Sequence, residues 1–376
     1  MRIHCLNKIS PVGLAKLPKG YELSDDINAC DAVLVRSAAM HEIELAPQVV
    51  AVARAGAGVN NIPLDKYADK GVVVFNTPGA NANAVKELTI AMMLLAARDI
   101  RGSMEWVKAN KEDPEINKSM EKAKGAFAGT EIMGKTLGVI GCGAIGALVA
   151  DAASKLGMRV IGVEPSEKTL ERYADLLKDT KIVSYDELFK EADYISVHVP
   201  LLDATRELLN KAAFAKMKDG VIIINAARDA LVNDDDLKEA LASGKVRRYV
   251  TDFPNAKTAN MEGVVAISHL GASTEEAEDN CASMAAAQVV DYIENGNIIN
   301  SVNFPALDLG KKVNHRVLVL VRGELPSEAL ALCKGDKMAN AVKGNSAALL
   351  AEMKEVPAGL EAKLLALPGV VKVRII

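Results

Sequence analysis

Short apolar runs recur along the first hundred residues and are separated by turn residues. The runs at 31–38, 49–57 and 71–78 are continuously apolar and rich in valine, which is typical of strands buried on both faces of a parallel sheet. Residues 81–99 instead repeat their apolar side chains at helical spacing. This alternation predicts an α/β domain in which helices connect parallel strands.

A charged and weakly apolar segment, 100–133, interrupts the pattern, and we interpret it as a solvated connector helix at a domain boundary. From residue 134 the alternation of apolar runs and helical stretches resumes, which predicts a doubly wound parallel sheet, the Rossmann arrangement. The further strand candidates are 135–141, 159–165, 181–184, 194–200, 220–228, 247–254 and 264–271.

The last hundred residues follow another pattern. An alanine-rich helix is predicted at roughly 273–295, followed by an extended segment at 297–305 and a hinge at 306–312. Residues 313–376 read as a small α+β module. A module of this size is only marginally stable alone, so we expect it to pack on another part of the chain.

Composition narrows the range of functions. The chain has 376 residues and a net charge of −4, which argues against general binding to nucleic acid or anionic membranes. No apolar run reaches 18 residues, and no long apolar stretch of a signal peptide opens the chain. The five scattered cysteines match neither a zinc site nor a disulfide framework. We therefore expect a cytoplasmic protein without a bound metal.

The hexapeptide GCGAIG at 141–146 follows a predicted strand and opens a predicted helix. In this context Gly141 permits a tight turn, Gly143 lets a pyrophosphate approach the backbone, and Gly146 lets helix and strand pack closely. Glu164 ends the next strand, where a carboxylate accepts hydrogen bonds from ribose hydroxyls and repels a 2′-phosphate. The motif predicts a site for NAD rather than NADP. The alternative is a glycine-tightened turn with no ligand and a surface acid at 164.

Five segments, taken in order, resemble the D-2-hydroxyacid dehydrogenases: LGVIGCGAIG, SVHVPL, INAARDALV, TDFPN and SHLGAST. The N-terminal segments VRSA, RAGAGVNNI and NTPGANANAVKELT resemble the phosphoglycerate dehydrogenase branch of that family, and the similarity covers residues 1–305. The tail resembles a shrunken ACT module. The resemblance implies NAD-dependent oxidation of 3-phospho-D-glycerate to 3-phosphohydroxypyruvate, the first step of serine biosynthesis, by hydride transfer.

The resemblance also implies a domain plan. A flavodoxin-like substrate-binding domain would comprise 1–96 and 285–306, an NAD-binding domain 97–284, and an ACT-like domain 313–376. The family places its catalytic cleft between the first two domains and assembles as homodimers or homotetramers through the cofactor domain.

The reaction needs a group that holds the substrate carboxylate and a group that exchanges the alcohol proton. The resemblance gives Arg228 the first role, since a guanidinium can hold a carboxylate by two parallel bonds. It gives His269 the second role, because imidazole carries and releases protons near neutral pH. Ordinary alternatives are a surface arginine at a helix start and a polar residue at a strand end. His198 is expected beside the cofactor without a proton-transfer role.

Further cofactor contacts follow from the resemblance alone. Asp252 matches the aspartate that hydrogen-bonds the nicotinamide amide. Other positions provide backbone contacts or close packing in the family: Ala57, Ala144, Ile145, Val199, Pro200, Ala226, Gly271 and Ala272.

One position departs from the family pattern. Relatives usually carry a glutamate five residues after the aspartate, paired with the histidine, whereas this chain has Lys257. Lys257 could have replaced the glutamate functionally, for example by binding a substrate phosphate or carboxylate, and we favour this interpretation. Alternatively the loop is shifted and Glu262 approaches His269, or the histidine works without an acidic partner.

Arg36 and Arg54 end apolar strands of the N-terminal domain and match arginines of the phosphoglycerate branch, so we predict that they bind the substrate phosphate. The alternative is a pair of solvated strand-end arginines. Asn81 and Asn83 could bind the substrate carboxylate or act only as helix caps.

Two other functions compete with the leading one. The protein could be another D-2-hydroxyacid dehydrogenase, such as a glyoxylate or hydroxypyruvate reductase, whose unphosphorylated substrate needs no arginine pair. It could also resemble the NAD-sensing corepressors of the family, which bind partner peptides. The tail lacks the usual Pro-Gly turn after its first strand, so we expect an assembly element rather than a serine sensor.

Overall fold

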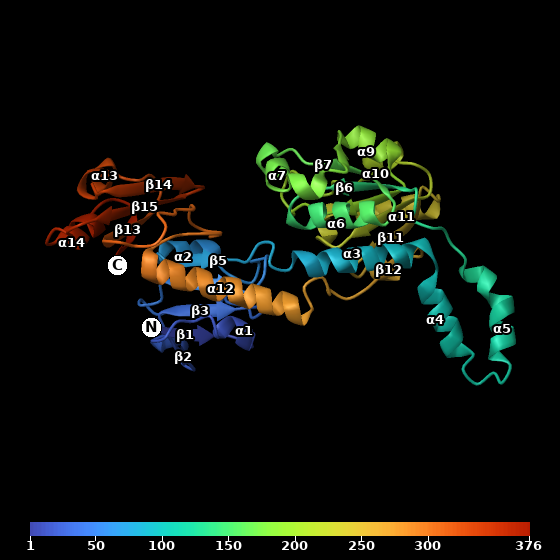
Figure 1. The fold of residues 1–376 in the computed structure, drawn as a ribbon, viewed down its shortest axis with the longest axis horizontal. Coiled ribbons are helices and arrows are strands. Elements are labelled where there is room, and N and C mark those ends of the chain that lie inside the picture. Colours follow the sequence, from blue (N-terminus) through green and yellow to red (C-terminus); the bar gives the residue numbers. More distant parts are fainter. The chain divides into compact units, whose positions relative to one another are not determined.

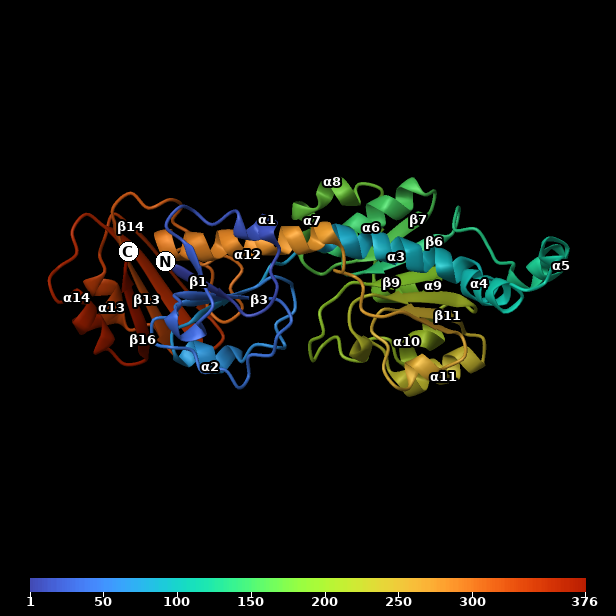
Figure 2. The same cartoon turned by 90° about the horizontal axis from the view of Figure 1, so that it is seen from below.

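The computed structural model describes residues 1–376 as two compact units, drawn in Figures 1 and 2. The first unit comprises 1–81 and 275–376, and the second comprises 82–274. The predicted crossings at 96 and 285 are therefore displaced. Helix α3 (Ala82–Ala97) packs against the second unit, and α12 (Glu275–Asn295) packs against the first, so each helix belongs wholly to one unit.

The second unit is built on a seven-stranded parallel sheet, which confirms the predicted doubly wound arrangement. From β6 the chain first adds β7 and β8 on one side of the sheet and then β9 to β12 on the other side, so the direction of strand order reverses at β6. Doubly wound sheets bind ligands at this position. The strands, in spatial order, are β12 (Val264–Ala266), β11 (Val246–Thr251), β10 (Val221–Asn225), β9 (Tyr194–Val197), β6 (Thr136–Ile140), β7 (Arg159–Val163) and β8 (Thr180–Ile182).

Helices cover both faces of this sheet because its strands are apolar on both sides. Helices α3, α6 and α8 share one hydrophobic core with the sheet, and α9, α10 and α11 share the other. The bounds are α6 (Ala144–Lys155), α7 (Glu167–Arg172), α8 (Ala174–Leu177), α9 (Tyr185–Glu191), α10 (Lys211–Lys216), α11 (Asp234–Ala242), η3 (Asp229–Leu231) and η4 (Thr258–Asn260).

The expected connector helix is instead a pair of helices within the second unit, α4 (Ile100–Ala109) and α5 (Ile116–Ala123), followed by η2 (Lys124–Phe127). Neither α4 nor α5 has a buried residue, and Figure 1 shows both projecting from the sheet. The prediction of a boundary here was wrong, because the chain has already entered the second unit at α3. The predicted solvent exposure of this segment is confirmed, since α4 and α5 have no buried residue.

The first unit has a five-stranded parallel sheet. Alternate residues of β3, β4 and β5 contact α12 on one face, and their neighbours form a second core with α2 on the other. Two strands, β1 and β2, were not predicted because they are short and only β1 has a fully buried residue. The elements are β1 (Arg2–Cys5), α1 (Pro11–Leu14), β2 (Glu22–Ser24), η1 (Ile27–Ala29), β3 (Ala32–Val35), β4 (Ala51–Arg54), α2 (Leu64–Asp69) and β5 (Val73–Phe75).

The tail forms a four-stranded antiparallel sheet of order β14-β15-β13-β16. One face packs on its two helices, and the other joins the core of the first unit, where Leu318 and Leu350 cluster with Tyr292. The expectation that the module packs on another part of the chain is confirmed. Its elements are β13 (His315–Arg322), α13 (Ser327–Leu332), β14 (Lys337–Lys343), β15 (Ser346–Met353), α14 (Leu360–Leu365) and β16 (Val370–Ile375).

The segment preceding the tail is not a free hinge. Leu307 is buried and exchanges two backbone hydrogen bonds with Ile298, at 2.7 and 3.0 Å. The predicted extended segment 297–305 runs beside β5, where the Asn303 side chain accepts from the Val74 amide at 2.8 Å and donates to the Val72 carbonyl at 2.9 Å. Side-chain bonds thus replace part of a strand ladder. None of the helices combines the length and apolar character needed to cross a bilayer.

Candidate active site

The glycine loop joins β6 to α6 as the sequence predicted. Gly141 has a φ of +89°, which favours glycine, and a Cβ on Gly146 would lie 1.9 Å from the Gly141 carbonyl oxygen. Gly143 precedes the first turn of α6, and a Cβ there would meet no atom within 4 Å. The backbone is therefore open where the amides of a 12-residue helix begin, which suits a pyrophosphate.

Glu164, at the end of β7, faces this loop. One carboxylate oxygen accepts from the Cys142 amide at 3.1 Å and the other from the Ser166 amide at 3.0 Å. These two bonds fix the carboxylate while leaving each oxygen a further lone pair for a ribose hydroxyl. The loop and the acid together fit NAD.

The remaining cofactor-contact candidates of the second unit follow the carboxyl ends of neighbouring strands. The absent Cβ of Gly141 would lie 2.8 Å from Cγ1 of Val199, so the β6 and β9 loops touch. The Gly271 amide donates to Asp252 at 3.1 Å, which joins the β11 and β12 loops. These candidates are Ala144 and Ile145 after β6, Val199 and Pro200 after β9, Ala226 after β10, Asp252 after β11, and Gly271 and Ala272 after β12.

His198, directly after β9, is partly buried. Its Nε2 lies 2.7 Å from the Ser196 hydroxyl oxygen, and burial lowers the pKa of His198 to about 4. A histidine with this pKa stays neutral near neutral pH. The structure thus agrees with leaving it out of proton transfer.

The depressed pKa of His198 predicts a pH-dependent stability. Unfolding restores an ordinary histidine pKa near 6.5, so the unfolded chain binds more protons between about pH 4 and 6.5, and stability falls as pH falls through that window. Because of His198, we expect the unfolding free energy to be about 1 to 2 kcal/mol lower at pH 5 than at pH 7. Urea unfolding of His198→Gln at both pH values should show a smaller loss than the parent. The exposed His315→Gln variant is the control, and an equal loss in His198→Gln would contradict the assignment.

Arg228 lies in an extended conformation at the end of the turn that follows β10. Asn225, fully buried, organises that turn: its amide donates to the Arg228 carbonyl at 2.8 Å and to the Tyr249 hydroxyl at 3.0 Å. The sequence analysis did not single out Asn225, although a polar residue ending the apolar strand VIIIN is a usable signal. Arg228 donates from Nη1 to the Ala227 carbonyl at 2.6 Å, which leaves the other guanidinium N–H groups for a carboxylate.

His269 and Asp252 lie together in the second unit. Asp252 is fully buried, and desolvation raises its pKa, while the nearby His269 and the Gly271 amide favour its ionised form. One carboxylate oxygen of Asp252 has no protein donor, as expected of an acceptor for an amide. The exposed His269 ring lies 4.3 Å from the Phe253 ring between centroids. Arg228 Cζ lies 5.0 Å from that same Phe253 ring, so the structure brings Arg228 and His269 to one aromatic side chain.

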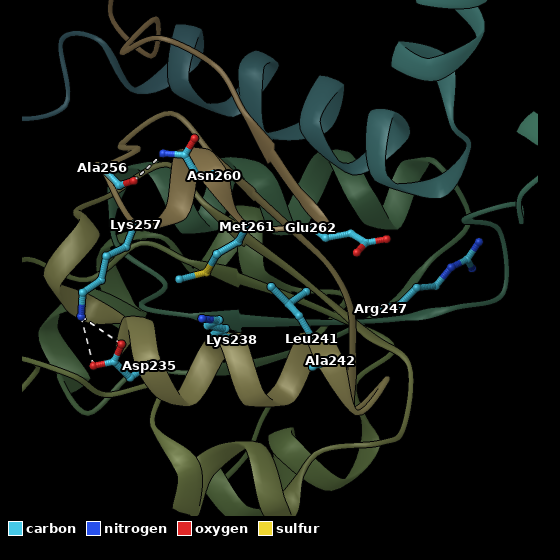
Figure 3. A pocket seen from close by; sticks show the side chains of 11 residues that line it. Asp235, Lys238, Leu241, Ala242, Arg247, Ala256, Lys257, Asn260, Met261 and Glu262 are labelled. Atoms are coloured by element: carbon cyan, nitrogen blue, oxygen red, sulfur yellow. Dashed lines mark hydrogen bonds and ion pairs between the residues drawn. The ribbon is translucent and has the colours of Figure 1, made fainter.

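Lys257 does not join this group. Its Nζ lies 2.9 and 3.0 Å from the two carboxylate oxygens of Asp235 at the start of α11, and Figure 3 shows this pair at one side of a pocket of about 760 Å³. Asn255 sets the direction of the loop, because its side-chain oxygen accepts from the Lys257 and Thr258 amides at 2.9 Å each. The ion pair with Asp235 raises the pKa of Lys257.

Glu262 lines the same pocket as Lys257, between α11 and the η4 segment. The interpretation that favoured a catalytic or substrate-binding Lys257 therefore receives no support from this arrangement, and neither does a shifted loop that brings Glu262 to His269. A histidine without a partner from this loop agrees best with the contacts.

In the first unit, Arg36 follows β3 and Arg54 ends the adjacent β4. Arg54 Nε donates to the backbone carbonyl of Arg36 at 3.0 Å, which holds the Arg54 guanidinium beside the residue that follows β3. Arg36 Nη2 also lies 2.6 Å from a carboxylate oxygen of Glu278 on α12, a contact that sequence reasoning missed. Both side chains of that pair are about two-fifths exposed, so a ligand can compete for Arg36.

Three other candidates belong to the first unit's N-terminal segment or to the start of α3. Asn81 immediately precedes α3, and Asn83 donates to Glu87 at 2.9 Å within the helix, so Asn83 acts locally. The carbonyl of Ala57 accepts from the Asn76 side chain at 2.6 Å, in the loop after β4. Substrate or cofactor contact for Asn81 and Ala57 stays a prediction.

Comparison with known proteins agrees with the geometry. Residues 90–271 match a family profile described as the D-isomer specific 2-hydroxyacid dehydrogenase, NAD binding domain. A hydroxypyruvate reductase of Thermotoga maritima is 40% identical over 269 residues, which cover 68% of this chain and 83% of that protein. A D-3-phosphoglycerate dehydrogenase of Methanocaldococcus jannaschii is 33% identical over 340 residues, which cover 87% of this chain and 63% of that longer protein.

Among solved structures, an NAD⁺-bound 3-phosphoglycerate dehydrogenase of Entamoeba histolytica aligns with a TM-score of 0.63 at 26% identity, covering 81% of this chain and 98% of that one. The same architecture is thus found in a protein that holds the cofactor. Because a relative is 40% identical over 68% of this chain, and the family profile matches residues 90–271, this chain belongs to the D-isomer-specific 2-hydroxyacid dehydrogenases, which are NAD-dependent oxidoreductases.

Proposed function

We propose that this enzyme oxidises 3-phospho-D-glycerate to 3-phosphohydroxypyruvate. The single observation that favours a phosphorylated substrate is that Arg36 and Arg54 lie at the ends of adjacent strands, where Arg54 Nε donates to the backbone carbonyl of Arg36. Two guanidinium groups supply the charge and the donors that a phosphate dianion requires. The similarity to D-3-phosphoglycerate dehydrogenases agrees with this substrate.

The second unit supplies the chemistry of the reacting carbon. NAD, when bound, accepts a hydride. Arg228 holds the substrate carboxylate, and its charge stabilises the negative charge that develops on the C2 oxygen. His269 accepts the proton of the C2 hydroxyl as the carbonyl forms, and returns it in the reverse reaction. Asp252 lies near His269 and keeps one carboxylate oxygen without a protein donor, as an acceptor for the nicotinamide amide.

A second candidate is reduction of hydroxypyruvate or glyoxylate. Two observations favour it: the similarity to a hydroxypyruvate reductase, and the ion pair in which Glu278 neutralises part of the charge of Arg36. The third candidate, an NAD-sensing protein without turnover, is disfavoured by the proximity of Arg228 and His269 to one ring. NADH absorbance assays with 3-phosphoglycerate, hydroxypyruvate and glyoxylate separate the three. Turnover of 3-phosphoglycerate supports our proposal, and turnover of unphosphorylated acids alone contradicts it.

Arg36 provides a sharper test of the phosphate assignment. We expect Arg36→Gln to raise the KM for 3-phosphoglycerate at least about tenfold, the value of one charge-assisted contact, with little effect on D-glycerate. Glu278→Gln is the matched control, because it breaks the same ion pair but keeps the guanidinium. We expect its KM for 3-phosphoglycerate to stay equal or fall. Equal impairment of both variants would mean that Arg36 only supports the fold.

We propose that the tail stabilises the first unit rather than sensing serine. Both faces of its sheet are covered, one by α13 and α14 and the other by the core of the first unit. Salt bridges reinforce the contact, since Arg322 reaches Asp65 at 3.1 Å and Asp69 at 2.7 Å on α2. A homodimer or homotetramer stays a prediction for this chain.

A further inference from the structure

The side chain of His269 has few means of being held in place. Its contacts are the ring of Phe253, at 4.3 Å between centroids and an interplanar angle of 44°, and the charge of Asp252. The loop residues expected to supply an acidic partner point to the pocket beside α11 instead. An exposed imidazole held so loosely would sample several rotamers, at a cost in reaction rate.

We propose that Phe253 is a positioning residue, whose ring fixes the imidazole of His269 and the guanidinium of Arg228 relative to each other. The inference rests on the roles proposed above for those two side chains. Arg228 Cζ lies 5.0 Å from the ring centroid, within the range of a cation–π contact, and a planar guanidinium stacks well on an aromatic face. One ring therefore contacts both groups that act on the substrate.

The backbone of Phe253 is well suited to this role. It follows Thr251 and Asp252 directly at the end of β11, and its amide donates to the Thr251 hydroxyl at 3.0 Å. Pro254 comes next, and a residue before proline is confined to extended conformations. A part-buried aromatic ring on a constrained backbone has few rotamers. The ring therefore limits the positions that the side chains of His269 and Arg228 can adopt.

The chemistry adds to the geometry. The π face of the ring attracts cations, and the imidazole carries a positive charge once it has accepted the substrate proton. Phe253 thus offers the protonated imidazole a favourable contact without a carboxylate from the following loop. This explains how the chain can dispense with an acid at position 257.

Replacement by leucine tests the proposal, because leucine keeps apolar volume but has no aromatic face. We expect Phe253→Leu to lower kcat by about tenfold and to raise the KM for the hydroxy acid, with an unchanged dissociation constant for NADH. Phe253→Tyr keeps the aromatic face, so its kcat should stay within about threefold of the parent value. Phe253→Met replaces the leucine variant if that variant does not fold. Phe189→Leu, which removes a core ring packed on Tyr185 in the same unit, should lower stability without changing KM.

A measurement without turnover completes the test. In proton NMR spectra, the imidazole signals of His269 should move downfield in Phe253→Leu, since the ring current is lost, and should keep their positions in Phe253→Tyr. Parent-like kinetics and unmoved signals in Phe253→Leu would overturn the proposal, as would a tyrosine variant as impaired as the leucine variant. His269→Gln and Arg228→Lys are assayed in parallel: if they keep full kcat, the proposed roles fail instead, and the NMR result still decides whether Phe253 holds the imidazole.

Discussion

Replacing His269 by glutamine is expected to lower kcat by about a thousandfold, which is typical of a lost general acid–base group. Glutamine keeps a hydrogen-bonding side chain of similar length but cannot accept and release a proton near neutral pH. The NADH dissociation constant should change little, because the glycine loop and Glu164 bind at other strand ends. Stopped-flow absorbance of NADH and fluorescence titration measure the two quantities.

His198→Gln is the matched control for this variant. His198 is the other histidine at a strand end of the same sheet, and its lowered pKa keeps the ring neutral and weakly basic near neutral pH. We expect its kcat to stay within about an order of magnitude of the parent. A His269→Gln enzyme with more than a tenth of the parental kcat would exclude His269 as the acid–base group, and a reversed order of the two variants would move that role to His198.

Loss of the buried arginine of the tail is expected to have the largest effect on stability. Arg316 is fully buried on β13, and its guanidinium bonds to Glu352 at 3.1 Å, to the Asn295 carbonyl at 2.7 Å and to the Leu309 carbonyl at 3.1 Å. It therefore joins the tail, α12 and the segment predicted as a hinge. Removing one member of a buried ion pair leaves the other charge uncompensated and typically costs about 3 to 5 kcal/mol.

We therefore expect Arg316→Met to lower the unfolding free energy of the first unit by about that amount in urea titrations. The double variant Arg316→Met/Glu352→Leu should recover a substantial part of the loss, because no unpaired carboxylate remains. Lys70→Met is the control, since its pair with Glu44 in the same unit is exposed and worth less than about 1 kcal/mol. An Arg316→Met chain as stable as the control would show that the tail is held by its apolar face alone.

The relation between local sequence and structure is clearest at the dinucleotide loop. The spacing of Gly141, Gly143 and Gly146 predicts a strand, a turn and a helix start. These constraints act within six residues, so the motif specifies this local structure without contacts from distant parts of the chain. Glu164 was predictable for the same reason, since it ends the next strand of one β-α-β unit. Continuous apolar runs likewise identified the buried parallel strands, because burial on both faces leaves no polar alternation.

Several site features depended on long-range contacts and could not be predicted. The partner of Lys257 is Asp235, 22 positions earlier, and the side chain of Asn255 on the same loop donates to Asp234, 21 positions earlier. Position 257 alone suggested a catalytic role, which its contacts do not support. Arg36 and Glu278 are separated by more than two hundred positions, so no local sequence pattern could predict their ion pair.

By itself, the sequence determined the α/β class, the doubly wound cofactor unit and its NAD loop, because each is encoded by periodicity or by a short motif. The candidates Arg228 and His269 came from the resemblance of their segments to a known family. Only the tertiary structure decided to which unit α3 and α12 belong. It also showed that the buried Arg316 joins the tail to the rest of the first unit, and that the Phe253 ring contacts both Arg228 and His269. The physical reason is that packing and ion pairing are properties of residues brought together in space, and the free energy of such contacts leaves no trace in the spacing along the chain.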